Sequence, residues 1–376
     1  MYKPQNTVLS ADSYTILNTI REQVGGEFKA ATPLVENAED AKAYGLYVCG
    51  SGDARNSFMN SLINRIAQVI CLVRSYQNSL KEFKRGMLGP GEMVENVWVN
   101  LVLPEGWQQN PVNPGDVFKT NNPQSEVTLH PVNSKLVYEI TTNDSELSLA
   151  FQSESGIYDM VSRIVARLTD SAEWDEYILM KYVLAKAALE NGDAVKSVPT
   201  LVAANADAII TEMKGVSNDM RFMNTDYNIA GVPTHSPISE QLFFLTAKSS
   251  AVLDVNALAS AYNLSYKEFV GAQQMINSFA FTDAEEERLE HIMEETVAQG
   301  LIPGFEPFSA EEQAKLESIV GATIDRDFFM IFDKLYQMTS QFDSLHLNTN
   351  SFLHAWKVYS YNPFANSVYF AEDSNF

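Results

Sequence analysis

A helical pattern of unusual length, from about residue 155 to residue 191, constrains the fold of this chain more than any other feature. Apolar side chains recur there at the three- and four-residue spacing of one helix face, and Gly192 supplies a stop. The recurring residues are Ile157, Met160, Val161, Ile164, Val165, Leu168, Trp174, Tyr177, Ile178, Val183, Leu184 and Ala187. Because helices in globular proteins average about 11–12 residues, this segment predicts a rod that forms the spine of an elongated subunit.

The segments around the rod predict an α+β chain. A short helix is expected at residues 14–24, where Gly25 and Gly26 stop it. After the rod, short strand candidates such as residues 242–246 alternate with short helices such as residues 255–262. A second helix before the rod carries on one face Phe58, Leu62, Ile63, Ile66, Val69 and Ile70.

Residues 93–140 predict a two-stranded excursion with a large tip. Alternating apolar residues from Val94 to Leu101 lead into a long polar stretch rich in Pro, Asn and Gly, and β-type residues resume at 136–140. A connection of about 30 residues is uncommon inside a compact domain and is more often a functional arm or disordered. We expect this arm to reach onto a neighbouring subunit.

Charge is unevenly distributed along the chain. Residues 283–320 carry eleven acidic and two basic side chains, a net charge of −9, whereas residues 54–85 carry a net charge of +5. The acidic block also has two helical patterns, 285–298 and 310–320. Because so much charge is costly to bury, the block is expected to be a helical surface excursion, on the outer surface and dispensable for the fold.

Composition excludes several classes of protein. The chain of 376 residues is 45% hydrophobic and has a net charge of −22, so it has enough apolar surface for a core and is repelled by phosphate backbones. A nucleic-acid reader is therefore disfavoured. The two cysteines are too few for a disulfide framework, and the first residues lack a signal-peptide pattern, which predicts synthesis in the cytoplasm without a membrane span.

No catalytic, cofactor-binding or metal-binding constellation is found in the sequence. The five histidines form no i, i+4 pair, the glycine groups at 50–52 and 86–91 match no phosphate-binding loop, and no GxSxG elbow occurs. The sequence thus predicts no catalytic residues, cofactor or metal.

Ordered segments of the chain resemble the major capsid proteins of picovirus-type short-tailed bacteriophages, which have the Hong Kong 97-type coat fold. No segment is diagnostic alone, but their order over some 350 residues is. The segments are Ser13–Arg21 with Glu27–Lys29, Asn56–Arg65, Leu80–Gly86, Ser171–Tyr177 with Met180 and Lys181, Leu253–Asn263, Asp327–Asp333, Trp356–Ser360 and Pro363–Val368.

This resemblance implies a division of the chain into four parts. They are an N-terminal arm at 1–50, a peripheral domain with the spine helix at 51–85, 146–198 and 343–376, an extended loop at 86–145, and an axial domain at 199–342 that includes the acidic insert 283–320. The implied function is that of a structural protein, not an enzyme. It self-assembles from pentamers and hexamers into an icosahedral or prolate head shell around double-stranded DNA, with a scaffolding protein and a portal as assembly partners.

Two other functions remain open from the sequence: an encapsulin-like compartment shell, and an acidic two-domain hydrolase or transferase whose site is assembled from distant residues. For the coat protein, we expect the aromatic residues of the arm and the basic residues of segment 54–85 to contact adjacent subunits. The predicted contact residues are Tyr14, Arg65, Arg74, Lys81, Lys84, Arg85, Trp98, Trp107 and Phe118.

Overall fold

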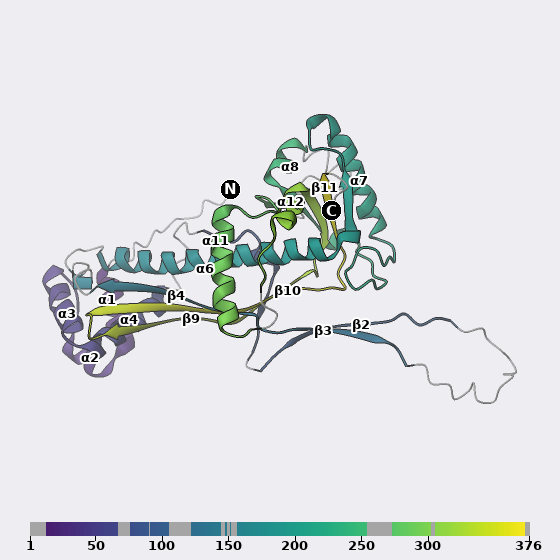
Figure 1. Cartoon of the computed structure of the whole chain (residues 1–376). Helices are drawn as coiled ribbons and strands as arrows, with labels where there is room; N and C mark the ends of the chain where they lie inside the picture. The colour runs from purple at the N-terminus through teal and green to yellow at the C-terminus, as the bar shows by residue number, and fades with distance from the viewer. Residues whose placement is uncertain are drawn as a thin grey trace, which may run out of the picture. The chain divides into compact units, whose positions relative to one another are not determined.

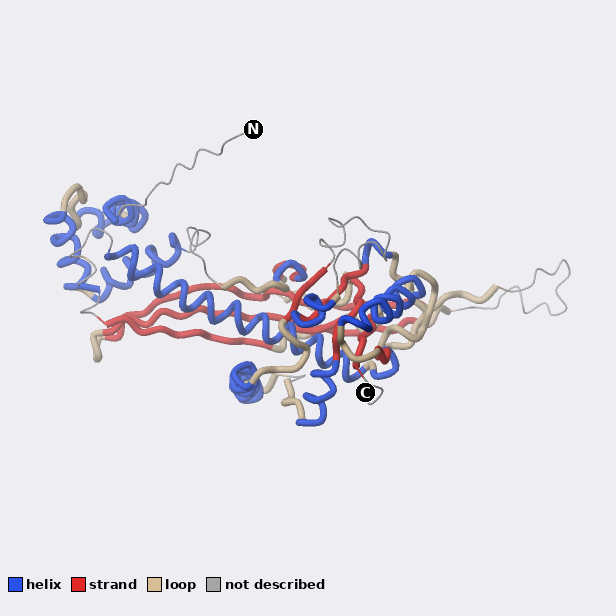
Figure 2. Tube along the Cα trace, turned by 90° about the horizontal axis from the view of Figure 1, so that it is seen from above, coloured by secondary structure: helices blue, strands red, loops and turns tan. Residues whose placement is uncertain are grey.

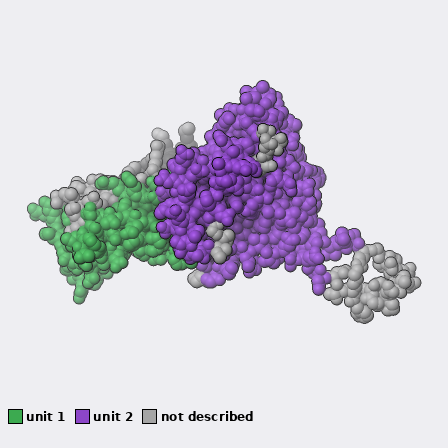
Figure 3. Space-filling model, viewed as in Figure 1, with its two compact units in different colours: residues 1–78, 135–176, 335–356 green, residues 79–134, 177–334, 357–376 purple. Residues whose placement is uncertain are grey.

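The computed structural model describes residues 13–66, 76–89, 91–104, 122–143, 147–148, 151, 156–253, 273–301 and 305–372. The chain forms two compact units (Figure 3). Unit 1 consists of residues 1–78, 135–176 and 335–356, and unit 2 of residues 79–134, 177–334 and 357–376. Each unit therefore draws on several separate stretches of the chain.

Unit 1 contains a cluster of helices around an aromatic core. Its helices before the rod are α1 (Ser13–Val24), α2 (Gly26–Ala31), α3 (Ala38–Gly50) and α4 (Gly52–Ile66). The Tyr44 ring meets the rings of Phe28 and Phe58 edge to face, at centroid distances of 5.8 and 6.0 Å. Asn37 caps α3 by accepting hydrogen bonds from two backbone N–H groups of its first turn. These contacts hold the first helices in one folded cluster.

The predicted rod is confirmed as α6 (Gly156–Glu190), a single helix of 35 residues. Its residues up to 176 belong to unit 1 and the remainder to unit 2. Between 177 and 188 almost every side chain is buried, because apolar residues lie around most of the helix there; Lys181 is buried among them.

A four-stranded sheet has the strand order β1-β9-β10-β4. These strands are β1 (Lys84–Met87), β4 (Ser134–Asn143), β9 (Phe329–Asp343) and β10 (Asn348–Tyr361). The long strands β9 and β10 are neighbours in this sheet (Figure 1). Figure 2 shows long strands running side by side. Their connecting turn places Leu347 at φ 53°, a left-handed conformation that is uncommon for leucine.

Unit 2 is built on a five-stranded mixed sheet with the order β5-β11-β8-β6-β7. The strands are β5 (Val195–Val198), β6 (Gln241–Thr246), β7 (Gln273–Ile276), β8 (Ile319–Asp325) and β11 (Ser367–Glu372). The inner strands β6 and β8 pair antiparallel, and every residue of β6 is buried. Such near-continuous apolar runs are typical of strands covered on both faces.

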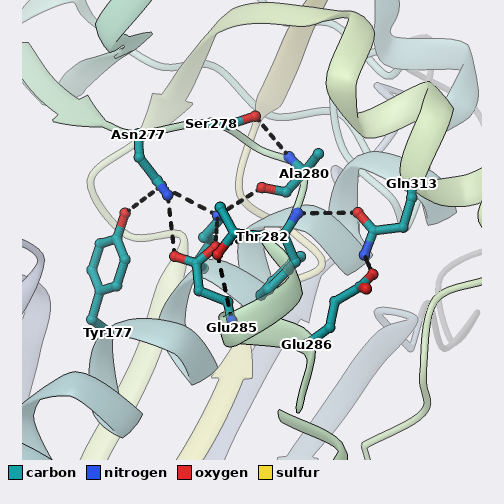
Figure 4. A network of polar contacts seen from close by, with 10 residues as sticks. Tyr177, Asn277, Ser278, Ala280, Thr282, Glu285, Glu286 and Gln313 are labelled. Carbon is teal, nitrogen blue, oxygen red and sulfur yellow. Dashed lines mark hydrogen bonds and ion pairs between the residues drawn. The ribbon is translucent and has the colours of Figure 1, made fainter. Parts of the chain in front are cut away.

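Apart from α6, the α-helices that the structure describes in unit 2 are α7 (Ala206–Asp219), α8 (Ala247–Val252), α11 (Asp283–Ala298) and α12 (Ala310–Ser318). Ile209, Met213 and Val216 of α7 pack into the same core cluster as Phe243 and Phe370 of the sheet. Both α11 and α12 begin with a capping box, formed by Thr282 with Glu285 (Figure 4) and by Ser309 with Glu312.

Residues 13–50 of the predicted arm 1–50 fold into helices α1 to α3, and Ile16, Ile20 and Val48 are buried in the core of unit 1. The assignment of this region as an N-terminal arm stays a prediction. Residues 1–12 lie outside the described part of the chain.

The structure corrects the prediction that residues 283–320 form a surface excursion dispensable for the fold. Ile319 and Val320 belong to the inner strand β8, and the carboxylate of Glu285 is buried in an ion pair with Lys181. Deletion of the whole block would therefore remove part of the sheet. The two helices that the sequence predicts there are confirmed as α11 and α12.

The predicted domain boundaries differ from the two compact units. The units divide within α6 at 176/177 and within the long strands at 334/335 and 356/357. The assignment of the units to a peripheral and an axial domain stays a prediction. The predicted helix at 255–262 lies outside the described residues.

Candidate functional site

A two-stranded antiparallel ribbon in unit 2 is the candidate site (Figure 1). It consists of β2 (Val94–Val99) and β3 (Ser125–His130), paired from Val94 opposite His130 to Val99 opposite Ser125. Two strands were predicted in this region, but the expected second strand at 136–140 belongs to β4 of another sheet. The actual partner lies within the stretch that the sequence shows as polar.

One exposed face of the ribbon is largely apolar, with Glu95 and Ser125 as its polar residues. Because side chains alternate along a strand, the odd-numbered residues of both strands share this face. Val97, Val99, Val127 and Leu129 on it expose 58%, 52%, 55% and 52% of their surfaces, and Val97 lies directly opposite Val127. The exposed apolar series continues through residues 101–103 beyond β2. We call the four side chains Val97, Val99, Val127 and Leu129 the apolar face.

A ribbon of only two strands leaves backbone groups and apolar side chains exposed to water. An isolated two-stranded ribbon is marginally stable in water, and its outer edges present backbone groups that can pair with another chain. Within the described residues, no third strand pairs with β2 or β3. A group of exposed apolar side chains marks a protein interaction surface more often than a single exposed one does. The apolar face is therefore the candidate interface.

The base of the ribbon is anchored by polar contacts within unit 2. The buried His130 ring lies with its Nδ1 2.8 Å from the Ser360 hydroxyl oxygen. Asn133 makes two hydrogen bonds with the backbone of Tyr359: its amide nitrogen donates to the carbonyl at 2.7 Å, and its oxygen accepts from the N–H at 2.8 Å. The returning strand is thereby tied to β10.

Burial, assisted by the positive charge of Arg85, lowers the pKa of His130 below its ordinary value. The imidazole is consequently neutral near pH 7, and this favours its burial at the base of the ribbon.

The outgoing strand is held by β9. The N–H of Leu88 donates to the carbonyl of Asp333 at 2.8 Å, and the Lys334 ammonium donates to the carbonyls of Gly89 and Glu92. Both strands are thus fixed at the base of the ribbon while the apolar face stays exposed.

The predicted basic contact residues occupy different environments. Lys84 lies 2.8 Å from the Asp333 carboxylate in a mostly buried ion pair, and Arg85 pairs with Asp327 at 2.8 Å. Lys81 is exposed. Lys84 and Arg85 therefore already have carboxylate partners within the same unit. The contact of all three cations with an adjacent subunit stays a prediction.

The predicted aromatic contact residues are described in part. Tyr14 is half-buried and packs against the core of unit 1, while Trp98 is half-buried on the face of the ribbon opposite the apolar face. The side chain of Arg65 and all of Arg74, Trp107 and Phe118 lie outside the described residues. The contact of these residues with adjacent subunits stays a prediction.

Sequence reasoning missed the apolar face itself. The signal was present, because VENVWV at 94–99 and SEVTLH at 125–130 both place apolar side chains at alternate positions. The second of these segments lies in a stretch rich in Pro and Asn, and its strand character was overlooked.

The described part of the chain shows no group of three or more His, Cys, Asp or Glu side chains arranged to hold a metal ion. Within the same described residues, no helix is long and apolar enough to cross a membrane.

Comparison with known proteins assigns the family. A match described as Phi29-like phage major capsid protein covers residues 17–371, nearly the whole chain. The chain belongs to this family. The major capsid protein of Bacillus phage GA-1 is 27% identical over 370 residues, which are 96% of this chain and 70% of that protein. The major capsid protein of Bacillus phage B103 is 28% identical over 366 residues, 96% of this chain and 73% of that protein.

The molecule is thus a major capsid protein of a tailed bacteriophage and a component of the virion. The capsid structure of Staphylococcus phage Andhra matches it with a TM-score of 0.60 at 11% identity, over 81% of this chain and 86% of that chain. This likeness shows the Hong Kong 97-type fold. The family match supports neither the encapsulin-like shell nor the hydrolase or transferase.

Proposed function

We propose that this capsid protein assembles by laying the apolar face of its β2–β3 ribbon on a neighbouring copy. The lattice would consist of pentamers and hexamers in an icosahedral or prolate shell. Assembly would take place in the host cytoplasm with a scaffolding protein and a portal, and the shell would enclose double-stranded DNA. No catalytic turnover is part of this function.

The observation that carries the proposal is an exposed apolar surface on an element with an anchored base. Fixing both strands at the base lowers the conformational entropy that is lost when the ribbon docks, so more of the burial energy contributes to association. An apolar centre with polar surroundings is the common composition of protein interfaces. A second copy of this chain is the partner that a capsid lattice supplies in every direction.

The net charge of −22 supports enclosure of DNA without sequence-specific binding. A chain this acidic gains little from counterion release on DNA, which is the main source of affinity in DNA-binding proteins. The shell would hold the genome by surrounding it.

A shortened ribbon tests the proposal. Val94 and His130 are cross-strand partners, so a two-residue Asn-Gly turn can join them after removal of residues 95–129. This variant keeps the contacts of His130 and Asn133 with β10. We expect a cooperatively folded subunit that forms no shells under conditions in which the unaltered chain, expressed with its scaffolding protein, does.

Electron microscopy and sedimentation velocity would measure shell formation, and circular dichroism would establish folding. As a matched control, Val202→Thr changes an exposed apolar residue elsewhere in unit 2 and should leave assembly unchanged. Shells of normal yield and stability from the shortened variant would overturn the proposed role of the ribbon.

A further inference from the structure

The turn between β9 and β10, residues 344–347 of unit 1, carries two exposed leucines. Leu345 and Leu347 expose 82% and 56% of their surfaces. Leu347 also has a φ of 53°, in the left-handed region where a Cβ costs energy. Glycine suits that conformation better, so the geometry of the turn does not explain why leucine stands there. A side chain that strains its own backbone and stays exposed points to a contact outside the subunit.

Hydrogen bonds hold this turn in place beside a negative charge. The Asp343 carboxylate accepts from Nδ1 of His346 at 2.7 Å and from the backbone N–H of Leu345 at 2.8 Å. These hydrogen bonds lower the pKa of Asp343 below its ordinary value, so the carboxylate stays charged. The two leucines are thus presented in a fixed position next to an anion, which reduces the entropy lost when they dock.

A groove on α3 in the same unit has the complementary character. Its volume is about 450 Å³, and it is lined by Lys42, Gly45, Leu46, Cys49, Ser148 and Phe151. The four α3 residues follow the i, i+3, i+4, i+7 spacing of one helix face. Gly45 lets the Phe151 ring pack directly against the helix, because a Cβ there would lie 2.7 Å from the ring. We call this site the α3 groove.

Helix α3 carries apolar residues on more than the side that faces the core of unit 1. Ala41, Tyr44 and Val48 are buried in that core, whereas Leu46, on another side of the helix, exposes 76% of its surface. A helix with apolar residues around most of its circumference is normally buried. The exposed Lys42 adds a positive charge to the same side. The groove therefore suits an apolar partner that carries an anion.

We propose that the β9–β10 turn of one copy inserts Leu345 and Leu347 into the α3 groove of a second copy, where Asp343 faces Lys42. The turn matches the groove in apolar character and in charge. Turn and groove are different surfaces of one chain, so each copy can give one such contact and receive another. Contacts of this head-to-tail kind build rings and extended lattices.

This contact is separate from the ribbon. The turn and the groove belong to unit 1, and the ribbon belongs to unit 2. Each of the two contacts can therefore be lost experimentally while the other remains, and the tests below read the turn and the groove without altering the ribbon.

Disulfide trapping tests the contact, because the free thiol of Cys49 already lines the groove. Cysteine is a small apolar residue, so full-length Leu345→Cys and Leu347→Cys should still form shells. Mild oxidation of these shells should join the new cysteine to Cys49 of another copy, since a disulfide forms only between closely placed residues. We expect dimers and larger oligomers on a non-reducing gel. Trypsin should then release residues 43–55 linked to residues 335–357.

Leu34→Cys is the matched control for trapping. Leu34 is an exposed leucine of unit 1 that does not line the groove. Its tryptic peptide, residues 30–42, should not be linked to residues 43–55 in shells oxidised in the same way.

Two further variants separate docking from folding. Leu347→Gly relieves the left-handed backbone, so it should not lower stability in urea, yet it removes an interface leucine. We expect the protein concentration at which shells form to rise about tenfold or more. Leu46→Ser should have the same effect from the groove side, and Leu34→Ser should leave the threshold unchanged.

Two results count against the proposal. One is that shells of both turn cysteine variants lack the link between residues 43–55 and 335–357. The other is that Leu347→Gly and Leu46→Ser assemble at the wild-type threshold, and this result decides the question even if the cysteine variants form no shells.

Discussion

Replacing the central cross-strand pair of the ribbon with threonine should weaken assembly without unfolding the subunit. Threonine has the shape and β-branching of valine, so Val97→Thr/Val127→Thr keeps the strand preference of both positions. Both side chains are more than half exposed in the subunit, so the change in unfolding free energy should stay within about 0.5 kcal/mol per site. In an interface, each added hydroxyl would be buried without a partner.

The expected loss follows from that burial. An unpaired buried hydroxyl costs about 1 kcal/mol at the lower end of mutational values, so two cost about 2 kcal/mol per docked ribbon. Since about 1.4 kcal/mol corresponds to a tenfold change in association, we expect docking to weaken roughly thirty-fold.

The assay is the protein concentration at which shells first form, measured by light scattering and confirmed by electron microscopy. Val202→Thr/Val297→Thr is the matched control, because it alters two exposed valines of unit 2 outside the ribbon. Equal assembly thresholds for the ribbon variant and the wild type would refute the reasoning. An equal effect of the control would show that the ribbon has no special role.

Three further predictions concern the subunit. A Cβ at Gly321 would lie 2.9 Å from a backbone carbonyl oxygen of β6. Gly321→Ala should therefore lower the free energy of unfolding, measured by urea titration, by about 1–3 kcal/mol. Gly215→Ala on α7 is the control, because a Cβ there meets nothing within 4 Å and should not lower it. The pKa of His130 is lowered in the folded state, so the stability that His130 contributes is present above its unfolded pKa of about 6.5 and is lost as the pH falls below that value. The free energy of unfolding should therefore depend less steeply on pH in His130→Gln than in the wild type. Lys84→Ala should destabilise the subunit by about 1.5 kcal/mol, because it breaks a mostly buried ion pair but leaves Lys357 3.6 Å from the Asp333 carboxylate. Exposed Lys81→Ala should cost less than this, and equal melting temperatures for the two variants would contradict the prediction.

The elements that the sequence predicts well are those with strong local patterns. Helix α6 was predicted to within a residue or two because its apolar period is sustained and Gly192 follows its end. Strand β6 was predicted because residues 242–245 form a short apolar run, which suits a strand buried on both faces.

Pairings between distant segments could not be predicted in the same way. Nothing local distinguishes β3 from β4 as the partner of β2, since both carry alternating residues and register depends on which face becomes buried. The burial of Glu285 was unpredictable for a related reason, because its partner Lys181 lies 104 residues away.

In the candidate site too, local patterns could be predicted from the sequence and contacts between distant segments could not. A two-stranded excursion in this region could be foreseen from the sequence, but the partners of Lys84 and Arg85 could not, because Asp333 and Asp327 are separated from them by more than 240 residues. A basic run in an acidic chain looked available to a neighbouring subunit, whereas its own fold supplies carboxylates to two of its residues.

The position of β11 in the sheet has a consequence for synthesis on the ribosome. β11 lies between β5 and β8, so the sheet has a missing inner strand until residues 367–372 have been made. At about 5–20 residues per second, the earlier strands emerge many seconds before the strand that joins them. From the completion of β8 at residue 325 until β11 is made, the nascent chain therefore carries an incomplete apolar sheet. Chaperone protection during that interval, and premature stop codons just upstream of residue 367, should affect the yield of folded subunit more than changes in any exposed loop.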